Sequence, residues 1–126
     1  MNTIKNGIKK RIKSFGYAFT GLYELIKSEP NARIHLVATL GIVTAGFLLC
    51  LSDEEWCVIM IVIALVWAAE AFNTVIEKIT DHLFPENHET ARIAKNVSAG
   101  AVLICAIAAL ICGVIIFFPK ITVLFH

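Results

Sequence analysis

The stretch Trp56–Asp81, WCVIMIVIALVWAAEAFNTVIEKITD, decides how this chain folds. Its first half is apolar and uncharged, which is typical of a helix buried in a bilayer or in a large core. The second half continues without a turn residue but carries Glu70, Asn73, Glu77 and Asp81. At 100° per residue these four side chains fall within about 80° of one another on a continuous helix. The stretch therefore predicts an apolar helix that ends in one polar stripe.

This acidic stripe has two interpretations. Ionisable groups at membrane depth are rare and commonly mark a functional site. The alternative is a helix that leaves the membrane with its acids simply solvated. Because the acids share one face of a helix that continues an apolar run, the spacing favours a site.

Composition indicates a small membrane protein. The chain has 126 residues, of which 58% are hydrophobic and 17% charged, and its mean hydropathy is +0.77. This length predicts a single domain over residues 1–126. The net charge of +1 gives no argument for a nucleic-acid partner. The four cysteines lie in or beside apolar runs without the spacing of a metal site, so we expect buried thiols.

Four segments have helical patterns. Residues 3–27 predict an amphipathic helix, because an apolar residue recurs every three or four positions from Ile4 to Ile26 and basic residues fill much of the rest of the first half. Three apolar segments are long enough to cross a membrane: 34–51, 56–76 and 97–118. We therefore expect an all-α membrane protein with one interfacial helix and three transmembrane helices.

Prolines and polar clusters separate these segments. Pro30 disfavours helical geometry at Glu29 and can itself open the next helix. Three further breaks are expected: an acidic turn at 52–55, a polar connection at 82–90 and the end of the last helix at Pro119.

The basic residues predict an orientation. Residues 1–33 hold seven of the eleven Lys and Arg and residues 77–96 hold three, whereas 52–55 hold none. Cytoplasmic segments of membrane proteins are enriched in Lys and Arg. We therefore expect a multi-pass membrane protein whose N-terminus and second connection are cytoplasmic and whose C-terminus lies outside.

This orientation gathers polar groups from three segments near the cytoplasmic surface: Glu29, Glu70, Glu77 and Lys95. Two carboxylates from separate elements suit Mg²⁺, which completes its shell with water and substrate phosphates. A nearby lysine suits phosphate charge, and a third carboxylate could take a proton from an alcohol. These are the parts of a phosphoryl-transfer site. Because the sequence has neither a Walker-type phosphate loop nor the glycine-rich loop of protein kinases, these residues leave a kinase as one option among several.

Further motifs resemble those of the small prokaryotic diacylglycerol kinase and undecaprenol kinase family. They are Gly16-Tyr17-Ala18-Phe19 with Gly21, the ExNxRxH pattern from Glu29 to His35, the ExxNxxxE pattern from Glu70 to Glu77 followed by Asp81, and the run from Glu86 through His88-Glu89 to Ala94-Lys95. The resemblance covers roughly residues 11–110 in order. Although ExxNxxxE alone is a weak signal, its combination with the other motifs and three spans is specific.

The resemblance implies a bacterial lipid kinase of the inner or plasma membrane, homotrimeric, with composite sites between helices of neighbouring subunits. In this family the acid matching Glu70 acts as general base on the lipid hydroxyl. The acids matching Glu29 and Glu77 hold Mg²⁺ with the ATP phosphates. We take Asn31 and Arg33 as further substrate-binding residues, with a plain basic anchor as the alternative role of Arg33.

The resemblance also assigns residues to the nucleotide. Those expected around ATP are Arg11, Tyr17, Glu29, Glu77, Glu86, His88, Lys95 and Asn96, and Asn73 is expected to line the site. His35 is interpreted as a polar residue near the membrane surface without a ligand role. Asn96 departs from the family pattern, which has an acid there. An amide keeps acceptor capacity but loses the charge, which leaves an inactive relative as an alternative.

Two kinds of function stay open. The first is ATP- and Mg²⁺-dependent phosphorylation of a membrane lipid alcohol. The ExNxRxH and FNTxIE motifs resemble the undecaprenol branch of the family more than the diacylglycerol branch, whose product is phosphatidic acid. The second is a non-catalytic membrane protein, such as a transporter subunit whose acids conduct cations. That function needs polar stripes in several spans, and the first and third spans have almost none.

Overall fold

The computed structural model contains four helices and describes residues 2–86 and 88–124, with side chains from 7 to 123 apart from 87. The helices are α1 (Asn2–Ser28), α2 (Pro30–Leu48), α3 (Asp53–Leu83) and α4 (Glu89–Leu124). These described ranges contain no strand. Three of the helices, α2, α3 and α4, are long and apolar enough to cross a membrane. The expected all-α membrane architecture is therefore confirmed.

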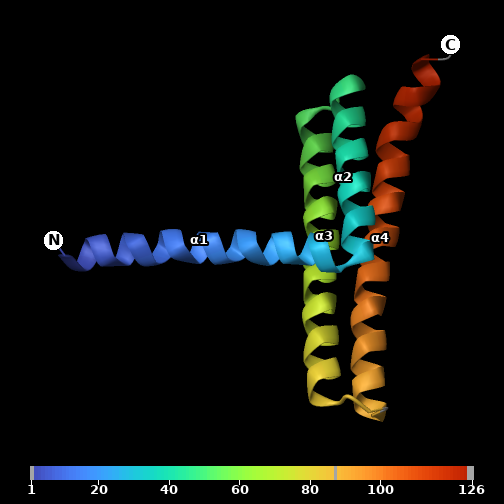
Figure 1. Cartoon of the computed structure of the whole chain (residues 1–126). Coiled ribbons are helices and arrows are strands. Elements are labelled where there is room, and N and C mark those ends of the chain that lie inside the picture. The colour runs from blue at the N-terminus through green and yellow to red at the C-terminus, as the bar shows by residue number, and fades with distance from the viewer. Residues whose placement is uncertain (1, 87, 125–126) are drawn as a thin grey trace.

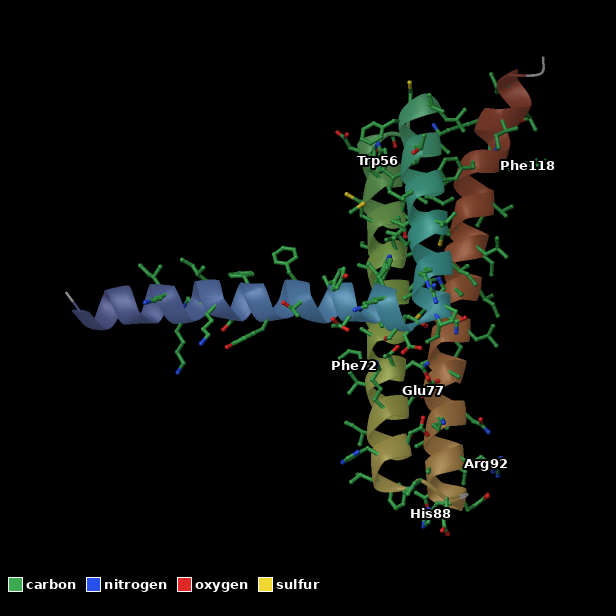
Figure 2. All side chains as sticks on the ribbon, viewed as in Figure 1. Trp56, Phe72, Glu77, His88, Arg92 and Phe118 are labelled. Atoms are coloured by element: carbon green, nitrogen blue, oxygen red, sulfur yellow. The ribbon has the colours of Figure 1, made fainter. Side chains whose placement is uncertain are left out.

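Helix α1 lies crosswise to the other three helices and projects from them (Figure 1). Along the part of α1 whose side chains are described, the predicted apolar stripe is exposed, including Ile12, Phe15 and Phe19. In Figure 2 most carbon-only side chains of α1 point to the side on which α2 rises, and most nitrogen-tipped chains point to the opposite side. This division is the one required of a helix lying in a membrane interface. Ile4, the first residue of the predicted stripe, lies outside the described side chains.

The chain turns sharply between α1 and α2 at Glu29. Its backbone is extended, with φ −106° and ψ 119°, and Pro30 occupies the first turn of α2 as expected. Proline suits that place because its missing N–H would have no partner within the helix. The Glu29 side chain makes no capping hydrogen bond, so its carboxylate stays available to other partners.

Helix α2 ends at Leu48, three residues before the predicted end at Leu51. The N–H of Leu51 donates to Gly46 O at 3.1 Å and that of Cys50 donates to Phe47 O at 3.3 Å. These two bonds form a Schellman motif, in which the residue after the cap is left-handed. Here that residue is Cys50, with φ 50°. The predicted end was wrong because glycine, the usual signal of this motif, is absent.

The acidic segment 52–55 is not a free turn as expected. Ser52 caps α3, accepting a hydrogen bond from Glu55 N while Glu55 Oε2 accepts one from Ser52 N at 2.7 Å. This capping box satisfies two backbone donors and places three acids at the positive end of the helix dipole. Residues Asp53–Glu55 therefore form the first turn of α3.

Helix α4 continues through Pro119 to Leu124, so the expected end at Pro119 was wrong. A proline within a helix removes one backbone hydrogen bond and crowds the preceding turn, but tertiary contacts on both sides hold this helix in place. Ile116 and Phe117 are buried just before it, and Lys120 lies 2.9 Å from Glu55 just after it.

Helices α3 and α4 form a long antiparallel hairpin, and α2 packs on α3 (Figure 1). Within the described ranges the Cα atoms of α2 and α4 stay more than 8 Å apart, so the two helices do not pack closely along their backbones. A largely apolar cavity of about 640 Å³ lies among the three helices instead. The tightest packing is at the end near the α2–α3 connection, where Leu51, Ile59, Ile116 and Phe117 are buried together.

Cysteines are more exposed in this single chain than we expected. Cys50 and Cys57 are exposed, whereas Cys105 and Cys112 are half-buried, and all four are free thiols.

Gly46 allows α2 to approach α3, and this contact generates a stability prediction. A Cβ atom at Gly46 would lie 2.7 and 2.9 Å from two ring carbons of Trp56, whereas nothing lies within 4 Å of one at Gly41. We expect Gly46→Ala to destabilise the fold by about 1–2 kcal/mol, because overpacking outweighs the gain in helix propensity. Gly41→Ala is the matched control and should be neutral or stabilising. Denaturation in micelles measures both, and equal stabilities would contradict the contact.

Candidate functional site

The polar stripe predicted on α3 faces progressively more solvent along the helix. Glu70 is 2% exposed and Asn73 is 6% exposed, whereas Glu77 is half-buried and Asp81 is exposed. Figure 2 places Glu77 between α3 and α4, and Phe72 on the side of α3 from which α1 projects. The acids are therefore not simply solvated, because the first of them is enclosed by protein.

Glu70 lines a cavity of about 280 Å³ together with Asn73 and Glu77 of α3. Asn31 and His35 of α2 also line it, and α4 closes it with small and aliphatic residues. The Oε2 atom of Glu70 has no hydrogen-bond partner among the described residues. A buried carboxylate oxygen without a partner is costly, which is typical of a group that acts on a ligand.

The structure places His35 next to Glu70, whereas its position in the sequence indicated no ligand role. Its Nε2 atom lies 3.8 Å from Glu70 Oε2, with 19% of its side chain exposed. Helical periodicity within one segment cannot predict this pair, because the two residues lie on different helices and come together only in the folded chain.

Asn73 lies in the middle of a short hydrogen-bonded chain. Ser98 Oγ donates to Asn73 Oδ1 at 2.7 Å, and Asn73 Nδ2 donates to Glu77 Oε1 at 2.9 Å. Asn73 thus lines the cavity, and the Glu77 carboxylate is oriented from α4 through it. Ser98 was missed by sequence reasoning, although an isolated hydroxyl near the start of an apolar span was the available signal.

The Glu29 side chain forms an ion pair with Lys78 of α3, a residue that no sequence motif marked. Lys78 Nζ lies 3.6 Å from Glu29 Oε1 and donates to Ser28 Oγ at 3.1 Å. Ser28 Oγ donates in turn to Glu29 Oε1 at 3.0 Å. The carboxylate of Glu29 is thus held at the α1–α2 junction by a cation from α3.

Metal-ligating groups are sparse at this site. No group of three His, Cys, Asp or Glu side chains within the described part of the chain could hold a metal ion. Glu29 and Glu77 could still supply two carboxylates to Mg²⁺, which commonly takes few protein ligands and fills its shell with water and phosphate oxygens. The donor chemistry therefore fits Mg²⁺ bound together with a phosphorylated ligand.

A second, polar cavity of about 500 Å³ lies at the end of the α3–α4 hairpin. Four of the expected nucleotide residues line it: Glu86, His88, Lys95 and Asn96. Lys95 Nζ donates to Asp81 Oδ1 at 2.8 Å, and the His88 ring stacks on Phe84 with centroids 4.6 Å apart. Figure 2 shows His88 and Arg92 at this end of the hairpin. A half-buried lysine and a stacked aromatic pair suit a phosphate and a flat base, respectively.

Two expected nucleotide residues are not brought to the others within one chain. Arg11 and Tyr17 lie about 26 and 17 Å along α1 from Ser28, at 1.5 Å per residue. Both are exposed on the projecting part of α1 (Figure 1). Arg33, expected to bind substrate, is also exposed and does not line the cavity at Glu70, whereas Asn31 does.

Comparison with known proteins gives the same family as the motifs. Residues 16–117 match the family described as prokaryotic diacylglycerol kinase. The chain is 35% identical to the undecaprenol kinase of Bacillus subtilis (strain 168) over 116 residues, which cover 92% of this chain and 94% of that protein.

Two diacylglycerol kinases are also similar. That of Synechocystis sp. (strain ATCC 27184 / PCC 6803 / Kazusa) is 37% identical over 84% of this chain and 61% of its own length. That of Escherichia coli (strain K12) is 31% identical over 83% of this chain and 86% of its own length. The chain therefore belongs to the prokaryotic diacylglycerol kinase family and is a lipid kinase of the multi-pass membrane type.

Proposed function

We propose that this enzyme transfers the γ-phosphoryl group of ATP, with Mg²⁺, to the hydroxyl of a lipid alcohol. The observation that carries the proposal is the buried Glu70 carboxylate, whose Oε2 lacks a partner among the described residues and faces a cavity between α2 and α4. A carboxylate in that position can accept the proton of an alcohol. Glu29 and Glu77 are the proposed Mg²⁺ ligands, and Mg²⁺ would neutralise phosphate charge.

The lengths of the helices support placing Glu70 at a membrane surface. Helix α2 has 19 residues, about 28 Å, which matches a hydrocarbon core of about 30 Å. Helix α1 lies crosswise at the start of α2, so its plane marks one boundary of that core (Figure 1). His35, the neighbour of Glu70, lies about 8 Å along α2 from Pro30. Glu70 therefore lies close to the boundary, where the hydroxyl of a membrane lipid resides.

The hairpin cavity supports a nucleotide site further along α3 from this carboxylate. Helices α3 and α4 have 31 and 36 residues, about 46 and 54 Å, so the hairpin extends beyond the plane of α1 into water. Lys95 and Asn96 line the cavity in this extension. ATP bound there would direct its phosphates along α3 towards Glu77 and Glu70.

The proposed enzyme is a homotrimer with composite sites. Arg11 and Tyr17 lie too far along α1 to reach the hairpin of their own chain, so they would act in the site of a neighbouring subunit. The exposed apolar faces of α3 and α4 offer the surface that such neighbours would cover.

Undecaprenol is the proposed substrate, with diacylglycerol as the alternative. The ExNxRxH and FNTxIE motifs support undecaprenol, as does the similarity to an undecaprenol kinase over nearly the full length of both chains. The similarity to two diacylglycerol kinases supports the alternative.

Transfer of labelled γ-phosphate from ATP, with Mg²⁺, to undecaprenol and to diacylglycerol in the same micelles tests the proposal. We expect product with the wild type and a loss of about 100-fold or more with Glu70→Gln, which keeps the shape but cannot accept the proton. Glu54→Gln, at the exposed opposite end of α3, is the matched control and should keep wild-type turnover. Full activity of Glu70→Gln would remove its proposed role, and equal turnover of both lipids would remove the preference.

The proposed orientation places α1 and the hairpin in the cytoplasm of a bacterial plasma membrane, and the α2–α3 connection outside. In a chain whose other cysteines are replaced by alanine, a membrane-impermeant maleimide should modify the exposed Cys50 in intact cells. In a second chain whose single cysteine comes from Ser14→Cys, on the exposed part of α1, modification should require lysis. The reverse pattern would contradict the orientation.

Asn96 is proposed to support nucleotide binding without the usual acid. Because Asn96 is exposed, a charge there is screened, and Asn96→Asp should change the KM for ATP by less than about fivefold. Thr90→Asp, which adds the same charge on the same helix outside the cavity lining, controls for general electrostatics. A rise of several decades in kcat with Asn96→Asp would show instead that the wild type is an impaired relative.

A further inference from the structure

His35 lies where the two cavities among α2, α3 and α4 meet. It lines the cavity at Glu70 and also the larger apolar cavity among α2, α3 and α4. The other lining residues of the apolar cavity carry no charge, and the hydroxyl of Thr39 already accepts a hydrogen bond from Trp67 Nε1 at 3.1 Å. Among the described residues, His35 is therefore the only titratable side chain that lines both the apolar cavity and the cavity at Glu70.

The separation between His35 and Glu70 is suited to a third polar group. At 3.8 Å, Nε2 and Oε2 are too far apart for a direct hydrogen bond, whose usual limit is about 3.2 Å. They are close enough for one oxygen atom to lie about 2.8 Å from both. Since Glu70 Oε2 has no other partner among the described residues, a hydroxyl in this position would satisfy it.

We propose that His35 and Glu70 together bind the hydroxyl group of the lipid substrate. His35 Nε2–H donates to the hydroxyl oxygen, and the hydroxyl donates its own proton to Glu70 Oε2. This inference deepens the proposed function and rests on it. It adds to the general base a second residue that touches the reacting oxygen and fixes its direction.

The chemical step follows from this arrangement. The hydroxyl proton passes to Glu70 Oε2 while the alcohol oxygen forms a bond to the γ-phosphorus of ATP. The bond between the γ-phosphorus and the β–γ bridging oxygen breaks, and its electron pair leaves with ADP. His35 transfers no proton in this step, because it holds the oxygen in line for attack.

This two-point contact would also select the acceptor. A hydroxyl fills both requirements, since it accepts from His35 and donates to Glu70. The carbon chain attached to it would leave past His35 towards the apolar cavity, whereas the phosphate donor would approach from the side of Glu77.

Steady-state kinetics of the full-length enzyme in micelles, with the lipid alcohol and ATP varied in turn, test the proposal. We expect His35→Ala to lower kcat/KM for the lipid by about 10- to 100-fold, because one hydrogen bond to the substrate is lost. The KM for ATP should stay unchanged. His35→Gln, whose amide can still donate, should recover most of the loss, whereas His35→Leu, which has similar bulk and no donor, should not.

His82→Ala is the matched control, because His82 is exposed on the hairpin and lines neither cavity. Helix content and thermal unfolding of each variant show whether it is folded. A wild type that phosphorylates no lipid would overturn the proposed function itself. An active wild type matched by His35→Leu in lipid kcat/KM would overturn only the role of His35. Equal losses for lipid and ATP, with no recovery in His35→Gln, would overturn it as well.

Discussion

The thickness of the bilayer is the constraint on which the rest of this structure depends. A hydrocarbon core of about 30 Å accepts roughly twenty helical residues, and α2, with 19, fits it almost without remainder. Helices α3 and α4 are half as long again or more, so their excess length has to leave the membrane on one side. Because the chain turns at Glu29 and α1 lies crosswise there, the excess length of α3 and α4 leaves the membrane beside α1, the basic amphipathic helix. The polar stripe of α3 crosses this boundary, which explains why its first acid is buried and its last is exposed.

Few contacts between helices assemble the site, and each joins residues distant in sequence. Glu70 meets His35, Asn73 meets Ser98, and Glu29 meets Lys78. The tightest packing lies away from the site, at the opposite end of the bundle. There Trp56 lies against Gly46, and Glu55 is fixed by both Ser52 and Lys120. The tight packing thus lies near the α2–α3 connection, and the candidate site lies around Glu70.

Hydropathy and helical periodicity were sufficient to predict the architecture. The four helices, the break at Pro30 and the shared face of Glu70, Asn73 and Glu77 all follow from patterns within single segments. Boundaries that depend on tertiary contacts were missed. Cys50 takes a left-handed conformation that usually calls for glycine, and Pro119 continues a helix that it usually ends. In both places buried neighbours outweigh the local preference.

The candidate site shows the same limit. Periodicity placed the acids on one face of α3, but it could not say which residue of another helix would face each acid. Lys78 and Ser98 were therefore not recognised, since each is an ordinary side chain whose role comes only from its neighbour. His35 was noted as the last residue of the ExNxRxH motif but was not expected to have a ligand role. Arg11 and Tyr17 show the converse, because the family resemblance assigns them to the nucleotide while the single chain leaves them apart from the hairpin.

The contact between Lys78 and Glu29 has a consequence for how a metal-dependent site can exist before its metal arrives. Lys78 Nζ lies 3.6 Å from the Glu29 carboxylate, so the chain itself supplies a counter-ion at this junction. At the proposed magnesium site, Glu29 would exchange Lys78 for the metal as its partner, and Lys78 would become available to phosphate oxygens. The Glu29 carboxylate therefore has a cationic partner whether or not the metal is bound.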